Sequence, residues 1–185
     1  MKKWFCLLLI LSCSLVFSSC ITTPPSIKNS ITSTTVPSTS SILFGDVSDY
    51  SIENPITYQD THFDFSVDYP SDWETAESQW WPATSDSEAS PDSGIVIYVE
   101  DNENENIYVF GQEGPVSGNI TSPQEDFITS NMDKGKLSFT KTDNEYEIWL
   151  VLGEGRHGAI IHVSEAYFTR NKAQILGILK SIKIS

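Results

Sequence analysis

Strict alternation of apolar and polar residues marks the start of the folded part of this chain. From Phe63 to Tyr69, every second residue is Phe, Val or Tyr, and the residues between them are Asp or Ser. A period of two over this length is typical of a strand with one buried face. Pro70 ends the predicted strand, and the Ser-Asp turn after it leads to Trp73. We therefore expect a globular domain that starts near Tyr58.

Two stretches further along are apolar on both faces, which predicts central strands of a sheet. They cover residues 95–99 and 107–110, and the Asp, Asn and Glu residues between them indicate a tight reversal of the chain. The two stretches therefore predict a hairpin.

A helix is predicted after these strands, from Ser122 to about Gly135. Serine can cap a helix, Pro123 suits its first position, and Glu125 completes a capping box. The apolar face of this helix is expected to consist of Phe127, Ile128 and Met132.

Three strands and a second helix complete the predicted domain. The strands lie around residues 137–139, 146–152 and 159–163. Apolar residues then recur at helical spacing from about Glu165 to Ser181. The predicted order is β-β-β-α-β-β-β-α, without the strand–helix alternation of a parallel sheet. We therefore expect an α+β fold, in which an antiparallel sheet of about six strands is flanked by helices.

The N-terminal residues predict a membrane anchor. Lys2 and Lys3 precede an apolar run from Trp4 to Phe17 that is too short for a stable membrane span, a pattern typical of a secretory signal peptide. The sequence Phe17-Ser-Ser-Cys20 resembles the lipobox of bacterial lipoproteins. The resemblance implies that Cys20 receives a diacylglyceryl group and becomes the N-terminus of the mature protein. The alternative is ordinary cleavage nearby, with Cys20 as a bystander.

The stretch after Cys20 is predicted to be a stalk. Residues 21–41 contain twelve Ser or Thr residues and three prolines, with too few apolar residues to bury a face. Beyond them, Phe44 and Ile52 offer apolar side chains for packing onto the edge of the domain. No cysteine follows Cys20, so the domain is expected to fold without a disulfide. The chain thus divides into a signal peptide (1–19), a stalk with lipidated Cys20 (20–57) and a globular domain (58–185).

Charge is distributed unevenly along the chain. The whole sequence has 25 acidic and 11 basic residues, a formal net charge of −14. From Asn29 to Asp133 there are 20 acidic residues and no Lys or Arg, whereas residues 134–185 hold eight basic and five acidic ones. A field of this sign argues against nucleic acid as a partner and favours cations or a basic protein. The alternative is that the acidic surface only keeps a secreted protein in solution.

A run of acidic and amide residues between two predicted strands is the best candidate for a metal site. Asp101, Glu103 and Glu105 have the spacing of the first ligands of an EF-hand. The rest of that motif is missing, because Asn106 replaces the required glycine and Gln112 replaces the bidentate glutamate. An EF-hand is therefore excluded, and the run predicts either an irregular calcium site or a solvated hairpin turn.

Other candidate residues identify no reaction. Trp80 and Trp81 interrupt a long polar loop, as a lid over the core or as an exposed contact for a partner. The three histidines, His62, His157 and His162, have no second His or Cys at the spacing of a zinc site. The sequence contains no GxSxG elbow, P-loop or GxGxxG fingerprint, so no catalytic residue is predicted.

Two short stretches of this sequence resemble PsbP-like domains. Residues 63–73, FDFSVDYPSDW, resemble the first strand and the YP-x-x-W turn of that family, and residues 175–182 resemble its C-terminal helix. The resemblance covers most of residues 60–185 and implies an antiparallel sheet between helices, an α/β/α sandwich. Members of the family are mainly non-enzymatic and include photosystem II assembly factors, a Ran-binding factor and many bacterial lipoproteins of unknown role.

These observations predict a lipoprotein on the extracytoplasmic face of a cell membrane, anchored through Cys20. Its expected role is a non-enzymatic module that binds or assembles a protein partner of the cell envelope, without a cofactor and without nucleic acid. Trp80 and Trp81 are the expected contacts for that partner. The alternatives are an envelope module that binds calcium through Asp101, Glu103 and Glu105, a hydrolase whose site the sequence does not reveal, and a purely structural surface protein.

Overall fold

The computed structural model describes residues 41–45, 47, 49–78, 92–116 and 124–185. All of them belong to one compact unit, Pro37–Ser185. The predicted signal peptide, Cys20 and the tryptophans Trp80 and Trp81 lie outside the described residues. Within the described ranges, no helix is long and apolar enough to cross a membrane.

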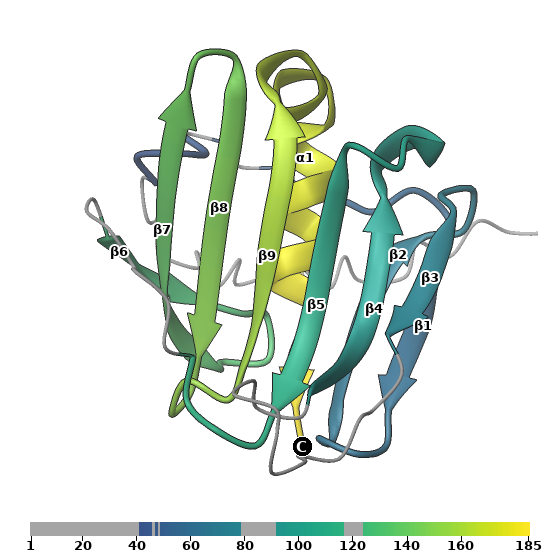
Figure 1. Ribbon diagram of the computed structural model, residues 1–185, viewed down its shortest axis with the longest axis vertical. Coiled ribbons are helices and arrows are strands. Elements are labelled where there is room, and N and C mark those ends of the chain that lie inside the picture. Colours follow the sequence, from purple (N-terminus) through teal and green to yellow (C-terminus); the bar gives the residue numbers. More distant parts are fainter. Residues whose placement is uncertain (1–40, 46, 48, 79–91, 117–123) are drawn as a thin grey trace, which may run out of the picture. The chain divides into compact units, whose positions relative to one another are not determined.

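The main element of the fold is a seven-stranded sheet with the order β3-β4-β5-β9-β8-β7-β6, in which every neighbouring pair is antiparallel (Figure 1). Its strands are β3 (Thr75–Ser78), β4 (Asp92–Tyr98), β5 (Asn106–Gln112), β6 (Gln124–Ile128), β7 (Lys134–Thr142), β8 (Glu145–Leu152) and β9 (His157–Ser164). The predicted hairpin is confirmed, because β4 pairs with β5 and Ile97 lies opposite Ile107. A short 3₁₀ helix, η1 (Val99–Asp101), connects these two strands.

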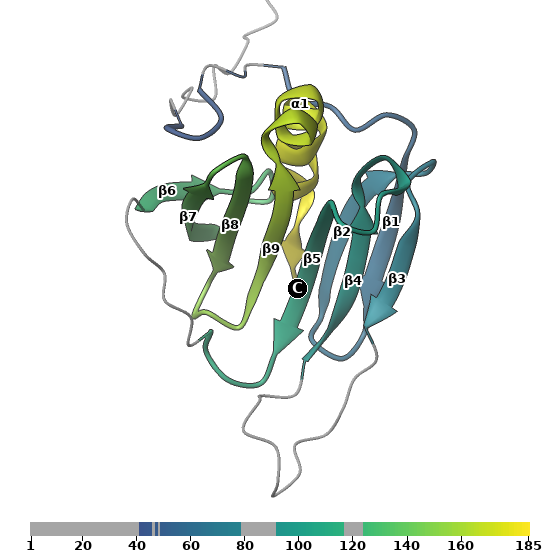
Figure 2. The ribbon, with the colours of Figure 1, turned by 45° about the horizontal axis from the view of Figure 1, so that its top comes forward.

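A second layer covers one face of this sheet (Figure 2). It consists of a small antiparallel sheet with the order β1-β2-β10 and of the helix α1 (Glu165–Ser181). The strands of the small sheet are β1 (Pro55–Asp60), β2 (Phe65–Pro70) and β10 (Lys183–Ile184). The helix was predicted with the bounds that the structure shows. Among the described residues it is the only α-helix, so the expected helices on both sides of the sheet are matched on one side alone.

The core lies between the two layers. The alternation that predicted the first strand is confirmed, because Phe65 and Val67 of β2 are fully buried. They meet apolar side chains of α1 and the inner face of the large sheet. The central members of this core, all without solvent exposure, are Ile97, Ile107, Ile148, Leu150, Ile161, Ile175, Ile178 and Leu179.

The helix predicted from Ser122 to Gly135 is wrong. Residues Gln124–Ile128 form the edge strand β6, which pairs with β7 along its whole length. Ser122 and Pro123 lie outside the described residues, and Glu125 accepts hydrogen bonds from residues 41 and 42. Pairing with β7 therefore outweighs the capping signal, since local propensity is weak compared with tertiary contacts.

The folded domain also begins earlier than the predicted boundary at residue 58. Leu43 and Phe44 are buried, and the ring of Phe44 lies 5.6 Å from that of Phe168 in α1. The backbone N–H of Ile42 and the hydroxyl of Ser41 both donate to the carboxylate of Glu125, at 2.7 and 2.6 Å. Residues 41–45, called the docked segment below, thus belong to the domain and not to the stalk. The expected packing of Phe44 is confirmed.

Candidate functional site

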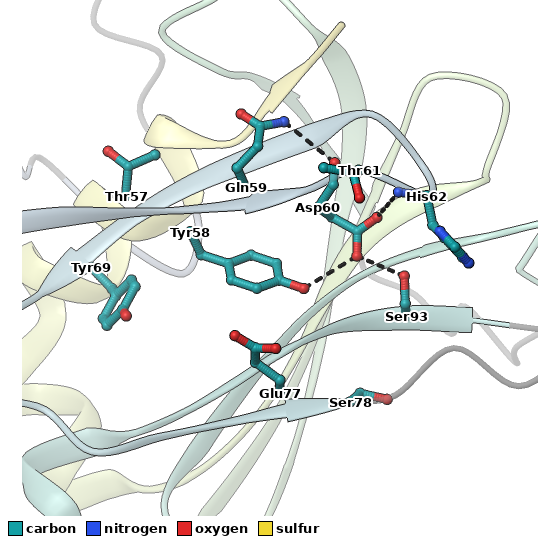
Figure 3. A pocket seen from close by; sticks show the side chains of 10 residues that line it. All are labelled: Thr57, Tyr58, Gln59, Asp60, Thr61, His62, Tyr69, Glu77, Ser78 and Ser93. Carbon is teal, nitrogen blue, oxygen red and sulfur yellow. Dashed lines mark hydrogen bonds between the residues drawn. The ribbon is translucent and has the colours of Figure 1, made fainter.

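An open cavity of about 570 Å³ lies where the edges of the two sheets meet (Figure 3). It is bordered by β1, which ends the small sheet, and by β3, which ends the large one. Its lining is polar and consists of Thr57, Tyr58, Gln59, Asp60, Thr61, His62, Tyr69, Glu77, Ser78 and Ser93. None of these ten described residues is a lysine or an arginine, and two of them, Asp60 and Glu77, are acidic.

Asp60 is the organising residue of the cavity. It ends β1 and is only 4% exposed. One carboxylate oxygen accepts the backbone N–H groups of His62 and Phe63, both at 2.8 Å, which closes the turn into β2. The other oxygen accepts the hydroxyl of Ser93 at 2.6 Å and that of Tyr58 at 3.2 Å. Asp60 thereby joins the small sheet to β4 of the large one (Figure 3).

These contacts fix the charges in the cavity. Burial alone raises the pKa of Asp60, but the hydrogen bonds from Ser93, from the two backbone N–H groups and from Tyr58 outweigh it and hold the pKa below its usual range. The pKa of the Tyr58 hydroxyl is raised by burial, by the charge and hydrogen bond of Asp60, and by the charge of Glu77. Asp60 is therefore ionised and Tyr58 is protonated at neutral pH.

The hydrogen bonds of Asp60 limit what this residue can do in the cavity. Asp60 already accepts four hydrogen bonds and is therefore poorly placed to take a proton from a substrate. Ser93 donates directly to Asp60, with no imidazole between them, so the two residues lack the order of a catalytic triad. Glu77 is exposed at the mouth of the cavity and can receive a positive charge (Figure 3).

The predicted calcium ligands lie elsewhere, in the connection between β4 and β5. The carboxylate of Asp101 accepts the backbone N–H of Glu74 at 2.7 Å, and that of Glu105 accepts the backbone N–H of Ser164 at 2.6 Å. In the parts of the chain that the structure describes, no group of three or more His, Cys, Asp or Glu side chains could hold a metal ion. Asp101, Glu103 and Glu105 are thus not brought into one cluster.

The acidic connection instead fastens the β4–β5 hairpin to α1. Glu105 is 8% exposed and contacts Ser164, which precedes the first turn of the helix. Glu100 forms an ion pair with Arg170 and accepts the side-chain amide of Asn171 at 2.9 Å. The hydrogen bond from Arg170 is the main reason why the pKa of Glu100 is lowered.

Replacement of Glu105 by alanine should therefore destabilise the fold. The change leaves the backbone N–H of Ser164 without its acceptor and removes a negative charge from a helix N-terminus. We expect a loss of about 1–3 kcal/mol in the free energy of unfolding. The measurement is urea unfolding of the soluble chain, which we define as residues 20–185 with Cys20→Ser.

The matched control is Glu103→Ala, which changes the net charge equally at an exposed position. Its expected effect is within about 0.5 kcal/mol. Equal losses for both variants would show that removal of a negative charge from this connection, and not the contact with Ser164, decides the effect.

Two of the histidines, His157 and His162, form no second site among the described residues. His157 makes a 2.8 Å hydrogen bond between its Nε2 and the backbone carbonyl of Phe63, and His162 is exposed on β9. The role predicted for Trp80 and Trp81 stays a prediction. Sequence reasoning missed the set of Tyr58, Asp60 and Ser93. An aspartate just before a hairpin turn is a signal for Asp60, but no local pattern points to Ser93, which comes from another sheet.

The fold is an antiparallel α+β arrangement in which a helix and a small sheet cover one face of a large sheet. Among solved structures, this chain is similar to the solution structure of cyanobacterial PsbP (CyanoP) from Synechocystis sp. PCC 6803. The identity is 12%, the match covers 73% of this chain and 95% of that one, and the TM-score is 0.48. This likeness concerns the backbone alone. No protein-family model and no curated protein sequence matches the chain.

Proposed function

We propose that this protein is a non-enzymatic binding module, held at the extracytoplasmic face of a membrane by a lipid on Cys20, which binds a basic protein partner. The observation that carries the proposal is the cavity between β1 and β3. It presents the buried, hydrogen-bonded charge of Asp60 and the exposed carboxylate of Glu77 and, among its described lining residues, no lysine or arginine. Charges held in place before binding favour a cationic ligand, because no reorganisation is needed.

The distribution of charge over the fold supports the same partner. The described residues from β1 to β5, including those that line the cavity, contain no lysine or arginine. The described basic residues lie on β7, α1 and β10 and in the β8–β9 turn: Lys134, Lys136, Lys141, Arg156, Arg170, Lys172, Lys180 and Lys183. A basic partner would therefore be attracted to the part of the domain that contains the cavity.

The position of the docked segment leaves the cavity accessible to a partner. It contacts Glu125 on β6 and Phe168 on α1. In the large sheet, β6 and β3 are the two opposite edges, so the docked segment and the cavity lie on different sides of the domain (Figures 1 and 2). A partner can thus reach β1 and β3 without competing with the docked segment.

Site-specific photo-cross-linking in intact cells tests this proposal. We expect a cross-linker at the exposed residue Thr57, beside the cavity, to form an adduct with a specific protein, and the charge-removing change Glu77→Gln to reduce it. The matched control is a cross-linker at Thr142, an exposed position on β7. The same adducts from both positions, or none from Thr57, would contradict binding at the cavity.

A further inference from the structure

We propose that the cavity binds its partner as an extended, lysine- or arginine-containing segment that pairs with the free edge of β1. This inference rests on the proposed function and names the form in which the basic partner is recognised. Addition of a strand to an exposed sheet edge supplies main-chain hydrogen bonds, while neighbouring pockets select side chains. Three features of β1 lead to it, namely its free backbone groups, its exposed position and the adjacent charges.

The pairing of β1 with β2 shows which backbone groups of β1 are free. Asp68 lies opposite Thr57, and both backbone groups of Asp68 bond the hydroxyl of Ser181, its N–H at 2.9 Å and its C=O at 3.2 Å. Opposite residues in an antiparallel pair alternate between exchanging two backbone hydrogen bonds and exchanging none. Thr57 therefore exchanges none with Asp68, and by alternation Gln59 exchanges none with Ser66.

The N–H and C=O groups of Thr57 and Gln59 consequently point to the outer edge of β1. No other strand in the described part of the chain pairs with that edge, because β1 is the last strand of its sheet. Both residues are exposed and both line the cavity. Together, Thr57 and Gln59 offer two backbone donors and two backbone acceptors, which is the pattern that an added strand requires.

Among the described residues, the edge lacks several of the features by which proteins usually protect a free edge. Proteins shield free edges with lysines, bulges, prolines or very short strands. β1 has six residues, carries no lysine and has its one proline, Pro55, at the first position. Ile56 of β1 is also 44% exposed, so an apolar side chain lies in solvent on this edge strand. A free edge beside a charged cavity is therefore a suitable docking surface for one segment in extended conformation.

The charges beside the edge select the side chains of that chain. Tyr58 and Asp60 alternate with Thr57 and Gln59 and point toward the large sheet, where Glu77 faces them (Figure 3). A segment paired with β1 would place every second side chain on this side as well. A lysine or arginine at such a position reaches Glu77 and the field of Asp60, whose own oxygens are already occupied by hydrogen bonds.

The test uses the soluble chain and a short synthetic peptide with blocked ends in which lysine alternates with valine. Its control is the same peptide with N-methyl groups on alternate backbone amides, which keeps the charge and removes the donors of one edge. We expect the methylated peptide to bind about tenfold more weakly, as measured by calorimetry at low salt, because tenfold corresponds to about 1.4 kcal/mol, the order of one hydrogen bond. Equal affinity for the two peptides would overturn edge pairing.

Two protein variants separate this inference from the proposed function. Gln59→Pro removes an outward N–H and keeps the backbone ladder with β2, but it also removes the side-chain hydrogen bond from Gln59 to the carbonyl of Phe65 at 3.0 Å. We expect it to weaken binding of the unmethylated peptide about tenfold, whereas Gln59→Ala, which loses the same side-chain bond and keeps the N–H, should not. Glu77→Gln should weaken both peptides and flatten the salt dependence, whereas the exposed Glu154→Gln, an equal change of charge in the β8–β9 turn, should not. Circular dichroism checks that each variant is folded.

The outcomes are distinct. Loss of binding in Glu77→Gln alone, with no effect of Gln59→Pro or of methylation, would overturn edge pairing and leave the acidic cavity as a binding site. Failure of the peptide to bind the unchanged protein would also overturn edge pairing, and the cross-linking experiment at Thr57 would still decide the proposed function.

Discussion

Truncation of Phe44 to alanine is expected to lower the free energy of unfolding by about 3–5 kcal/mol. The side chain of Phe44 is 1% exposed and its ring packs against Phe168 of α1. Removal of a buried ring costs the lost transfer free energy and leaves a cavity that the surroundings fill only in part. Urea unfolding of the soluble chain, followed by circular dichroism, measures the difference.

The control for this prediction is a neighbour in the same segment. Ile42 is 68% exposed, and we expect Ile42→Ala to change the free energy of unfolding by no more than about 0.5 kcal/mol. A small effect of Phe44→Ala, similar to that of Ile42→Ala, would mean that the docked segment detaches readily and adds little to the core.

The docked segment also affects the predicted tether. In the proposed lipoprotein, the residues between Cys20 and Ser41 would set how far the domain stands from the lipid, and each residue detached from the domain would add to that reach. Glu125 holds the segment through the hydroxyl of Ser41 and the N–H of Ile42. A stable contact here therefore fixes the point at which the chain enters the domain.

Much of the fold could be predicted because its strands have a buried side with a clear period. The alternation from Phe63 to Tyr69 and the two-faced stretch 95–99 both correspond to strands, β2 and β4. The C-terminal helix has a stripe of apolar residues long enough to be identified without ambiguity. In these elements the local pattern and the tertiary packing agree, which is the usual condition for a correct prediction.

The errors arose where distant partners decide the conformation. β6 was predicted as a helix because Glu125 suggested a capping box, whereas pairing with β7 and contacts with residues 41 and 42 determine its state. β1 was not predicted as a strand, because all its residues except Tyr58 and Asp60 are exposed and it lacks a clear buried face. The short apolar segment at Phe44 gives no periodic signal at all.

The candidate site was hidden for the same reason. Tyr58 and Asp60 come from β1, Glu77 from β3 and Ser93 from β4, so the cavity exists only after the small sheet has packed on the large one. What the sequence did reveal is the sign of its charge, because no lysine or arginine occurs anywhere from Asn29 to Asp133. The sign of the charge can be inferred from such a long stretch without basic residues, whereas the arrangement of the cavity residues cannot.

Replacement of Asp60 by alanine is the second change with a large expected effect, a loss of about 3 kcal/mol in the free energy of unfolding. It deprives three donors of their acceptor, the backbone N–H groups of His62 and Phe63 and the hydroxyl of Ser93. The hydroxyl of Tyr58 loses one of two acceptors and keeps the backbone carbonyl of Gly94 at 3.4 Å. Asp60→Asn should cost only about 1 kcal/mol, because its amide oxygen can accept the two N–H groups and its NH₂ group can donate to the hydroxyls.

The same pair of variants has a defined pH dependence. The pKa of Asp60 is lower in the folded state than in the unfolded chain, where the pKa of an aspartate is about 3.9. Its contribution to stability is therefore complete above the unfolded pKa and is lost as the pH falls through the lower, folded pKa. We expect the difference in unfolding free energy between the unchanged soluble chain and Asp60→Asn to shrink with acidification below about pH 4.

Urea unfolding at a series of pH values measures this difference. Parallel pH profiles for the two proteins would show that Asp60 is not the group whose ionisation stabilises the junction of the sheets.

Asp60→Asn also separates shape from charge in the cavity, because it keeps the hydrogen-bonded frame and removes a buried negative charge. The lysine-containing peptide should therefore bind this variant more weakly at neutral pH, although the fold is nearly as stable, since the charge of Asp60 acts on a cation through its field.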